Sequence, residues 1–119
     1  MVKSEEYIKT CVELCSTSFN MIDKDILHAV LGLGTEAGEI QDAVKRTLFY
    51  GAKLDEVNLK EEAGDLMWYL AILLNKLGIS FEDVMETNVK KLKLRYPEKF
   101  THEKALNRDL QGEREVLND

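Results

Sequence analysis

Two nearly identical stretches, Glu-Ala-Gly-Glu at 36–39 and Glu-Ala-Gly-Asp at 62–65, constrain this chain more than any other feature. Each places two acidic residues three positions apart within largely apolar sequence, where charge is costly. In an α-helix, residues three positions apart lie on the same face, about one turn from each other. Each stretch therefore predicts a pair of carboxylates that project from one side of a helix.

The interval between the two stretches predicts that they meet. From Glu39 to Glu62 the chain is long enough for a loop and an antiparallel return, so two packed helices could bring all four acids to one point. Glycine in a helix interior costs about 1 kcal/mol relative to alanine. Because Gly38 and Gly64 lie inside the two acid pairs, we expect them to let two helix backbones approach closely.

Four carboxylates in one pocket repel one another and resist the loss of water, and a hard divalent cation removes both costs. Oxygen-only ligands suit Mg²⁺ or Mn²⁺, so the pattern predicts a metal centre that binds Mg²⁺, with Mn²⁺ as a substitute. The alternative is a pair of solvated acidic faces, but a second matching pair in apolar sequence favours the metal centre. A ferritin-like di-iron site would need Glu-x-x-His on two helices, and neither His28 nor His102 has glutamate three residues before it.

The residues that mark helix starts and stops along the sequence predict an all-α fold resembling a four-helix bundle. The helices are expected at about 4–19, 23–48, 55–78 and 80–97. Candidate capping residues mark their ends: Ser4, Asp23 or Asp25, Asp55, Gly78 and Ser80. We expect a single domain over residues 1–119, with the bundle at about 4–97 and a polar, partly ordered tail at about 98–119.

The composition of the chain indicates which classes of partner and which cellular compartment to expect. The net charge of −6 speaks against a nucleic acid polymer or an anionic membrane surface as partner. It leaves room for a small anionic substrate, provided that a metal ion supplies positive charge. Cys11 and Cys15 are expected to be free thiols, and no apolar secretory signal opens the chain. These features predict a cytoplasmic protein.

The longest apolar run, Leu66–Leu74, predicts self-association. It is too short to cross a bilayer, yet it is apolar on every side of its helix, and such a helix must be covered on every side. Four helices of this size cannot enclose one of their own completely. A homodimer or a homotetramer is therefore expected.

Several polar and aromatic side chains are candidates for substrate binding. Asn88, Lys91 and Arg95 recur at i, i+3 and i+7, so that they share one helix face and could bind phosphates, although a solvated basic face is the alternative. Tyr69 lies four residues after Asp65 and could stack on a base, whereas Trp68 should point away, toward an interface. Weaker phosphate-binding candidates follow the first acid pair: Lys45, Arg46 and Lys53.

Three segments, GTEAGEIQDAVKR, KEEAGDLMWYLAILLNKLGIS and NVKKLKLRYPEKF, resemble the MazG-like branch of the all-α nucleoside triphosphate pyrophosphohydrolases over about residues 27–109. The resemblance implies an oligomeric helical bundle and hydrolysis of a (deoxy)nucleoside triphosphate between its α and β phosphates, which gives the monophosphate and pyrophosphate. It also implies that four acids bind Mg²⁺ and carry the catalysis: Glu36, Glu39, Glu62 and Asp65.

One position departs from the family pattern, and it bears on the reaction. Many relatives have a glutamate where this chain has Thr35; if that acid positions the attacking water, Glu61 or Glu62 must do so here. Two other functions stay open, namely a dUTP- or dUDP-preferring all-α diphosphatase and a non-catalytic helical module that binds nucleotide or metal. Retention of all four acids favours the enzyme. The base and sugar of the substrate are left open.

Overall fold

The computed structural model describes residues 1–118, which form helices and contain no strand. The helices are α1 (Ser4–Leu14), α2 (Lys24–Tyr50), α3 (Glu56–Leu77), α4 (Phe81–Arg95), α5 (His102–Leu106) and α6 (Leu110–Asn118). The predicted all-α class is confirmed, while the four-helix bundle stays a prediction. No helix in this part of the chain is both long enough and apolar enough to cross a membrane.

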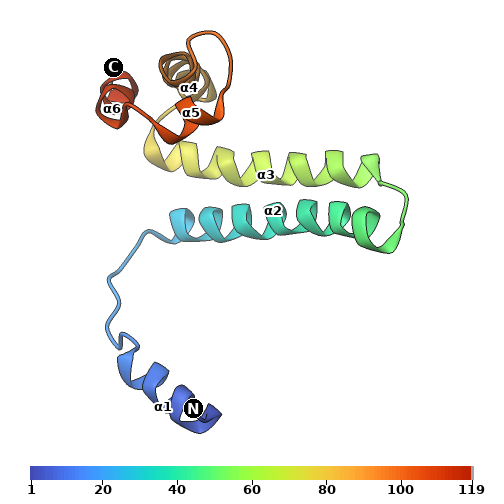
Figure 1. The fold of residues 1–119 in the computed structure, drawn as a ribbon. Helices are drawn as coiled ribbons and strands as arrows, with labels where there is room; N and C mark the ends of the chain where they lie inside the picture. The colour runs from blue at the N-terminus through green and yellow to red at the C-terminus, as the bar shows by residue number, and fades with distance from the viewer. Residues whose placement is uncertain (119) are drawn as a thin grey trace.

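The centre of the molecule is an antiparallel hairpin of α2 and α3, which lie side by side along most of their length (Figure 1). Local capping defines its ends. The Asp23 side chain accepts hydrogen bonds from two N–H groups at the start of α2, and Asp55 accepts one at the start of α3. Gly51 and Gly78 end these helices at φ 70° and 69°, a left-handed conformation that favours glycine. The predicted ends of the hairpin helices are therefore confirmed to within a few residues.

The next turn was also predicted from its capping residues. Ser80 caps α4 and forms a capping box with Asp83, because each side chain accepts a hydrogen bond from the backbone N–H of the other residue. The helix ends at Arg95, two residues before Pro97. The expected region of 80–97 is thus close to the observed helix.

The first helix is shorter than predicted. It has Lys3 rather than Ser4 as its N-cap, and it ends at Leu14 instead of near residue 19. Ser16 donates a side-chain hydrogen bond to the carbonyl of Ser18 at 2.9 Å. Such local bonds compete with helix formation, which explains the early end. The segment 15–23 then runs without a helix between α1 and the hairpin (Figure 1).

Residues 98–118, expected as a polar tail, contain α5 and α6, and α6 packs on α4. The contact is centred on Glu113, whose side chain is only 4% exposed. Its carboxylate accepts hydrogen bonds from Arg95 Nε at 2.7 Å and from Arg108 Nη2 at 2.7 Å. The buried Glu113 of α6 thus pairs with one arginine from α4 and one from the segment before α6. Residue 119, the last of the expected tail, lies outside the described residues.

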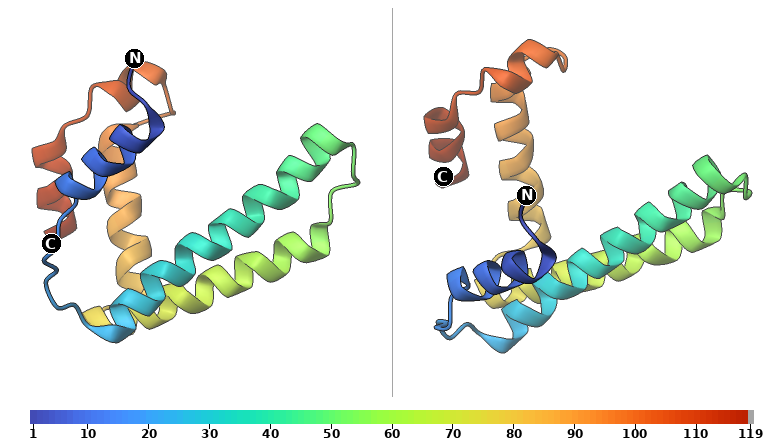
Figure 2. Two further views of the ribbon diagram at one scale, coloured as in Figure 1. Left: turned by 90° about the horizontal axis from the view of Figure 1, so that it is seen from below. Right: turned by 60° about the horizontal axis from the view of Figure 1, so that its bottom comes forward.

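A single chain leaves most of its apolar surface open. Its radius of gyration is 20.0 Å, whereas a compact domain of this length would have about 13.5 Å. Ala29 and Leu74 are the only buried apolar side chains larger than glycine in the described part, and Trp68 within the long apolar run is 60% exposed. Helix α1 lies apart from the hairpin in Figure 1, and Figure 2 shows α4 extending away from it. One chain therefore covers the apolar run Leu66–Leu74 only in part.

We predict that the α4–α6 contact depends on the charge of Glu113. Hydrogen bonds from Arg95 and then Arg108 lower the pKa of Glu113 to about 2, from an ordinary value of 4.5. Its ionised form therefore stabilises the docked helix above about pH 4.5, and this contribution is lost as the pH falls toward about 2. Glu113→Gln should release α6 already at neutral pH, seen as a shift of the NMR signals of residues 110–118 toward random-coil values. The control is Glu115→Gln, an exposed acid on the same helix, and equal shifts in both variants would contradict the prediction.

Candidate metal centre

Carboxylates from α2 and α3 meet across the hairpin. One oxygen from each of Glu36, Glu62 and Asp65 lies within 4.8 Å of the other two. Glu62 is buried, while Glu36 and Asp65 are half-buried. The structure thus brings together three of the four acids that were expected to share a site.

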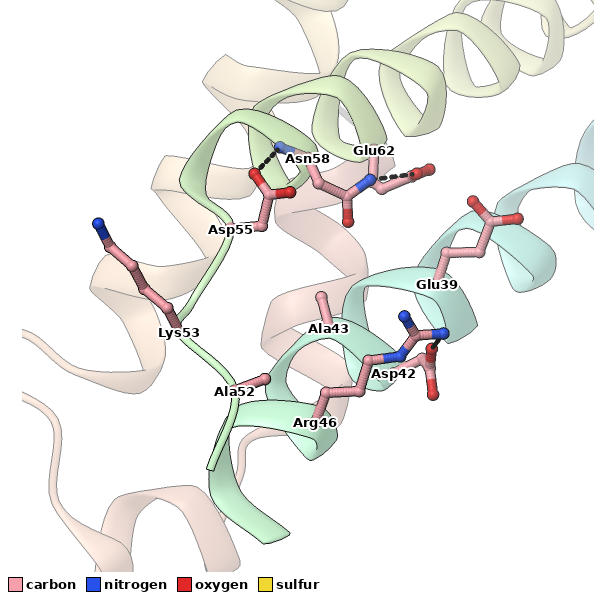
Figure 3. Close-up of a pocket in the computed structure, with 9 residues that line it drawn as sticks. All are labelled: Glu39, Asp42, Ala43, Arg46, Ala52, Lys53, Asp55, Asn58 and Glu62. Carbon is pink, nitrogen blue, oxygen red and sulfur yellow. Dashed lines mark hydrogen bonds and ion pairs between the residues drawn. The ribbon is translucent and has the colours of Figure 1, made fainter. Parts of the chain in front are cut away.

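The fourth acid, Glu39, lies one turn further along α2 and is exposed. It does not belong to the tight group of three, but its side chain interacts with that of Glu62 across the hairpin. Figure 3 shows the Glu39 and Glu62 carboxylates facing the same gap from opposite helices. Glu39 therefore lies beside the group, at the edge of a cavity that opens next to it.

Two carboxylate oxygens in this group, Glu36 Oε2 and Glu62 Oε2, are buried without a hydrogen-bond partner among the described residues. The other oxygen of Glu62 accepts a hydrogen bond from Asn58 Nδ2 at 3.1 Å. Buried polar atoms nearly always have a partner, so two unpartnered carboxylate oxygens at one point require an explanation. An all-oxygen donor set on two facing helices fits a hard divalent cation such as Mg²⁺ or Mn²⁺.

The electrostatics of the group show the repulsion that a cation would relieve. The close contact with the Glu62 carboxylate, burial and the charges of the neighbouring acids together raise the pKa of Glu36 to about 7. Contact with Glu62 likewise raises the pKa of Glu39, while the contacts with Glu36 and Glu39 lower that of Glu62. The cluster therefore shares a proton among acids that cannot all ionise without cost. No lysine or arginine within residues 1–118 forms an ion pair with these acids.

An aromatic group lies on the other side of the acids. The Tyr69 ring makes an edge contact with His28 at a centroid distance of 5.6 Å and stacks on Trp68 at 5.1 Å. Trp68 is 60% exposed, and its ring stacks on that of Tyr69 at an interplanar angle of 26°. The expectation that Trp68 points toward an interface stays a prediction. A Cβ atom on Gly32 would overlap the Tyr69 ring. Gly32 is thus the residue that lets this ring lie against α2.

The interpretation of the other two glycines is not supported. A Cβ atom at Gly38 or Gly64 would meet nothing within 4 Å in this chain, so neither glycine permits a close approach of α2 and α3. The reason is helix geometry: the residue two positions after an acid lies about 200° around the helix from it. The residue that could have been found from sequence is Gly32, because it lies four positions before Glu36 on the same stripe.

The candidate phosphate-binding residues of α4 do not reach the acids of their own chain. Asn88 is exposed and Lys91 half-buried on a helix that leaves the hairpin (Figure 2). The Arg95 guanidinium is held by Glu113 and lies 5.7 Å from the centre of the Tyr96 ring. Within one chain, the metal centre and the α4 residues are therefore separate groups.

The structure adds a cavity that sequence reasoning did not identify. It has a volume of about 630 Å³ and extends from Glu39 and Glu62 toward the loop that joins α2 to α3. Arg46 and Lys53, two of the weaker phosphate-binding candidates, line it, whereas Lys45 does not. The spacing in the sequence could have indicated that Arg46 lines this cavity. Arg46 follows Glu39 by seven positions, which places both on one helix face.

Comparison with known proteins agrees with this site. The MazG nucleotide pyrophosphohydrolase domain family matches residues 25–100, a segment that contains the α2–α3 hairpin and its acids. The Gene 37 protein of Mycobacterium phage L5 is 36% identical over 72 residues, which are 57% of this chain and 63% of that protein. The match thus spans less than two thirds of that relative, and no solved structure matches the chain. The family predicted from the sequence motifs is confirmed: the chain belongs to the MazG nucleotide pyrophosphohydrolase domain family.

Proposed function

We propose that the protein is a Mg²⁺-dependent nucleotide pyrophosphohydrolase. It cleaves a (deoxy)nucleoside triphosphate between the α and β phosphates and gives the monophosphate and pyrophosphate. The observation that carries the proposal is the pair of buried, unpartnered oxygens of Glu36 and Glu62, inside the segment that matches the family. An acid cluster of this kind lowers the stability of a protein that binds no cation, whereas it suits a protein that binds a nucleotide complexed with a metal ion.

The four acids have distinct places in this proposal. Glu36, Glu62 and Asp65 would hold the ion, and Glu39 would complete the site on the side of the cavity. When bound, Mg²⁺ stabilises negative charge on phosphate oxygens and lowers the pKa of water. Thr35 has no carboxylate with which to orient water. Its hydroxyl donates a hydrogen bond to the Leu31 carbonyl at 3.1 Å.

Two residues were candidates for orienting the attacking water. Glu61 is exposed, whereas Glu62 is buried beside Glu36. We therefore assign the orientation of water to Glu62 rather than to Glu61. Tyr69, held against Gly32 at the aromatic side of the acids, would contact the base.

Self-association is part of the proposed function. A homodimer or a homotetramer would cover the open surface of the chain, including the exposed Met67 and Trp68 of the apolar run. Helix α4, which contains Asn88, Lys91 and Arg95, extends away from the hairpin (Figure 2). In an assembly, α4 of one copy would have the opportunity to approach the acids of another.

The proposed function predicts that activity depends on a divalent metal ion. In a panel of the common nucleoside and deoxynucleoside triphosphates, the purified protein should release pyrophosphate, not orthophosphate, from its substrates in Mg²⁺ or Mn²⁺, and release should stop with EDTA. Mg²⁺ should also raise the melting temperature, because it binds acids that are clustered only in the folded protein. Full turnover in chelator would refute the metal centre. Turnover of dUTP or dUDP alone would indicate the diphosphatase, and metal binding without turnover the non-catalytic module.

Neutral amide variants separate catalysis from folding. Glu39→Gln or Asp65→Asn keeps the shape of the side chain and removes one charge, so turnover should fall by at least about 10²-fold. The melting temperature without metal should hold or rise, because a member of a repelling cluster has been neutralised. Glu56→Gln, at an exposed position on α3, is the control. A Glu39 or Asp65 amide variant that unfolds readily yet keeps normal specific activity would contradict the assignment.

The proposed self-association predicts the oligomeric state. At micromolar concentration, light scattering should show a dimer or a tetramer and no monomer, because Leu66–Leu74 needs cover that one chain does not supply. The single tryptophan, Trp68, offers a second readout. Its fluorescence emission should move to longer wavelength as dilution separates the subunits. A cooperatively folded monomer would show that the apolar run is covered in some other way.

A further inference from the structure

The face of α2 that carries the acids continues beyond them in both directions. Gly32, Glu36, Glu39, Ala43 and Arg46 follow one another at spacings of three or four residues, so they lie along one stripe of the helix. The Tyr69 ring lies against the Gly32 end. The opposite end carries a cation, Arg46. The acids therefore lie between an aromatic end and a basic end of the same helical seam.

A cavity lies at the basic end of this stripe, next to Arg46. The cavity of about 630 Å³ begins at Glu39 and Glu62 and is lined further along by Ala43, Asn58 and Arg46. Ala43 is the stripe residue between Glu39 and Arg46, and its small side chain leaves space where a larger one would fill the seam. Figure 3 shows this gap between the two helices, with Glu39 and Glu62 at one side of it. A group extending from the acids toward Arg46 would lie in this cavity.

Arg46 retains donors for such a group. Its Nη2 lies 2.9 Å from Asp42 Oδ2, and the side chains are 66% and 50% exposed. An exposed pair of this kind contributes little to stability, and a guanidinium has five N–H donors, most of which this one contact does not use. Lys53 also lines the cavity, but in Figure 3 its amine points away from the acids. Arg46 is therefore the cation best placed along the seam.

The charge of the cavity determines what could bind there. Four acids line it, Glu39, Asp42, Asp55 and Glu62, against the two cations Arg46 and Lys53. This balance repels a free anion. An anion that arrives with a divalent cation at the acids would find the repulsion relieved and a guanidinium two helical turns further along. The chemistry fits a polyphosphate complexed with Mg²⁺.

We propose that Arg46 binds the β and γ phosphates of the substrate, so that the nucleotide lies along the α2–α3 seam with its base toward Tyr69 and its leaving group in the cavity. The inference rests on the proposed function and adds the direction of the substrate to it. During hydrolysis a water oxygen bonds to the α phosphorus, and the bond to the bridging oxygen breaks with its electron pair going to pyrophosphate. The proton of the water passes to solvent. Arg46 offsets the charge that grows on the leaving pyrophosphate.

The test measures binding of inorganic pyrophosphate by calorimetry, with and without Mg²⁺, to the full-length protein. Arg46→Ala should weaken pyrophosphate binding in Mg²⁺ by at least about tenfold, the loss expected for one charge-assisted hydrogen bond. Arg46→Lys should recover part of that affinity. Binding of Mg²⁺ alone should be unchanged in all variants, because Arg46 is not a metal ligand. Lys45→Ala is the matched control, since it removes a neighbouring cation that does not line the cavity.

The outcomes distinguish this inference from the proposed function. Equal pyrophosphate affinity in Arg46→Ala, Lys45→Ala and the unmodified protein would overturn the role of Arg46, even if every variant hydrolyses nucleotides. No pyrophosphate binding to the unmodified protein in Mg²⁺ would overturn it as well. Binding that depends on Arg46 in a protein that hydrolyses no triphosphate would support the phosphate site and contradict the proposed reaction. Circular dichroism of each variant checks that the exposed substitution leaves the helices intact.

Discussion

Repulsion among the carboxylates at the α2–α3 seam is the constraint on which the rest of this structure depends. Glu36 and Glu62 each hold a buried oxygen with no partner among the described residues, and the pKa of Glu36 is raised to about 7 by its contact with Glu62 and by burial. Hydrophobic side chains at these positions would stabilise the hairpin better. The helices instead hold like charges together, which is favourable only when a cation joins them. A cation bound as proposed above would offset this cost to the stability of the hairpin.

The elements around the hairpin follow from that arrangement. Few apolar residues of α2 and α3 are fully buried within one chain, although most of the run Leu66–Leu74 is half-buried. The remaining helices do not cover them: α1 lies beyond an extended segment, and α4 turns away with α6 attached to it. A chain with a radius of gyration of 20.0 Å is too open to be stable by its own core. The acid cluster and the exposed apolar surface are therefore carried by the same two helices.

Local features of the fold could be predicted from the sequence, whereas contacts between distant segments could not. Asp23, Asp55 and Gly78 were identified as helix ends, since a cap depends on only a few neighbouring residues. Glu113 was assigned to a tail, because nothing near it indicates that Arg95, eighteen positions earlier in the chain, will donate to it. The roles of Gly38 and Gly64 were misjudged for a related reason. Their effect depends on what faces them in space, and in this chain nothing does.

The sequence by itself determined the helical class, the ends of the hairpin and the pairing of acids on two helix faces, because helix periodicity and capping are local properties. The family also followed from short motifs, and the match over residues 25–100 agrees with them. Only the tertiary structure decided which oxygens lack a partner, that Tyr69 lies against Gly32, and that Arg46 rather than Lys45 lines the cavity. Each of these depends on the distance and rotation between two helices. That relation is set by packing across the seam, to which residues far apart in the chain contribute together.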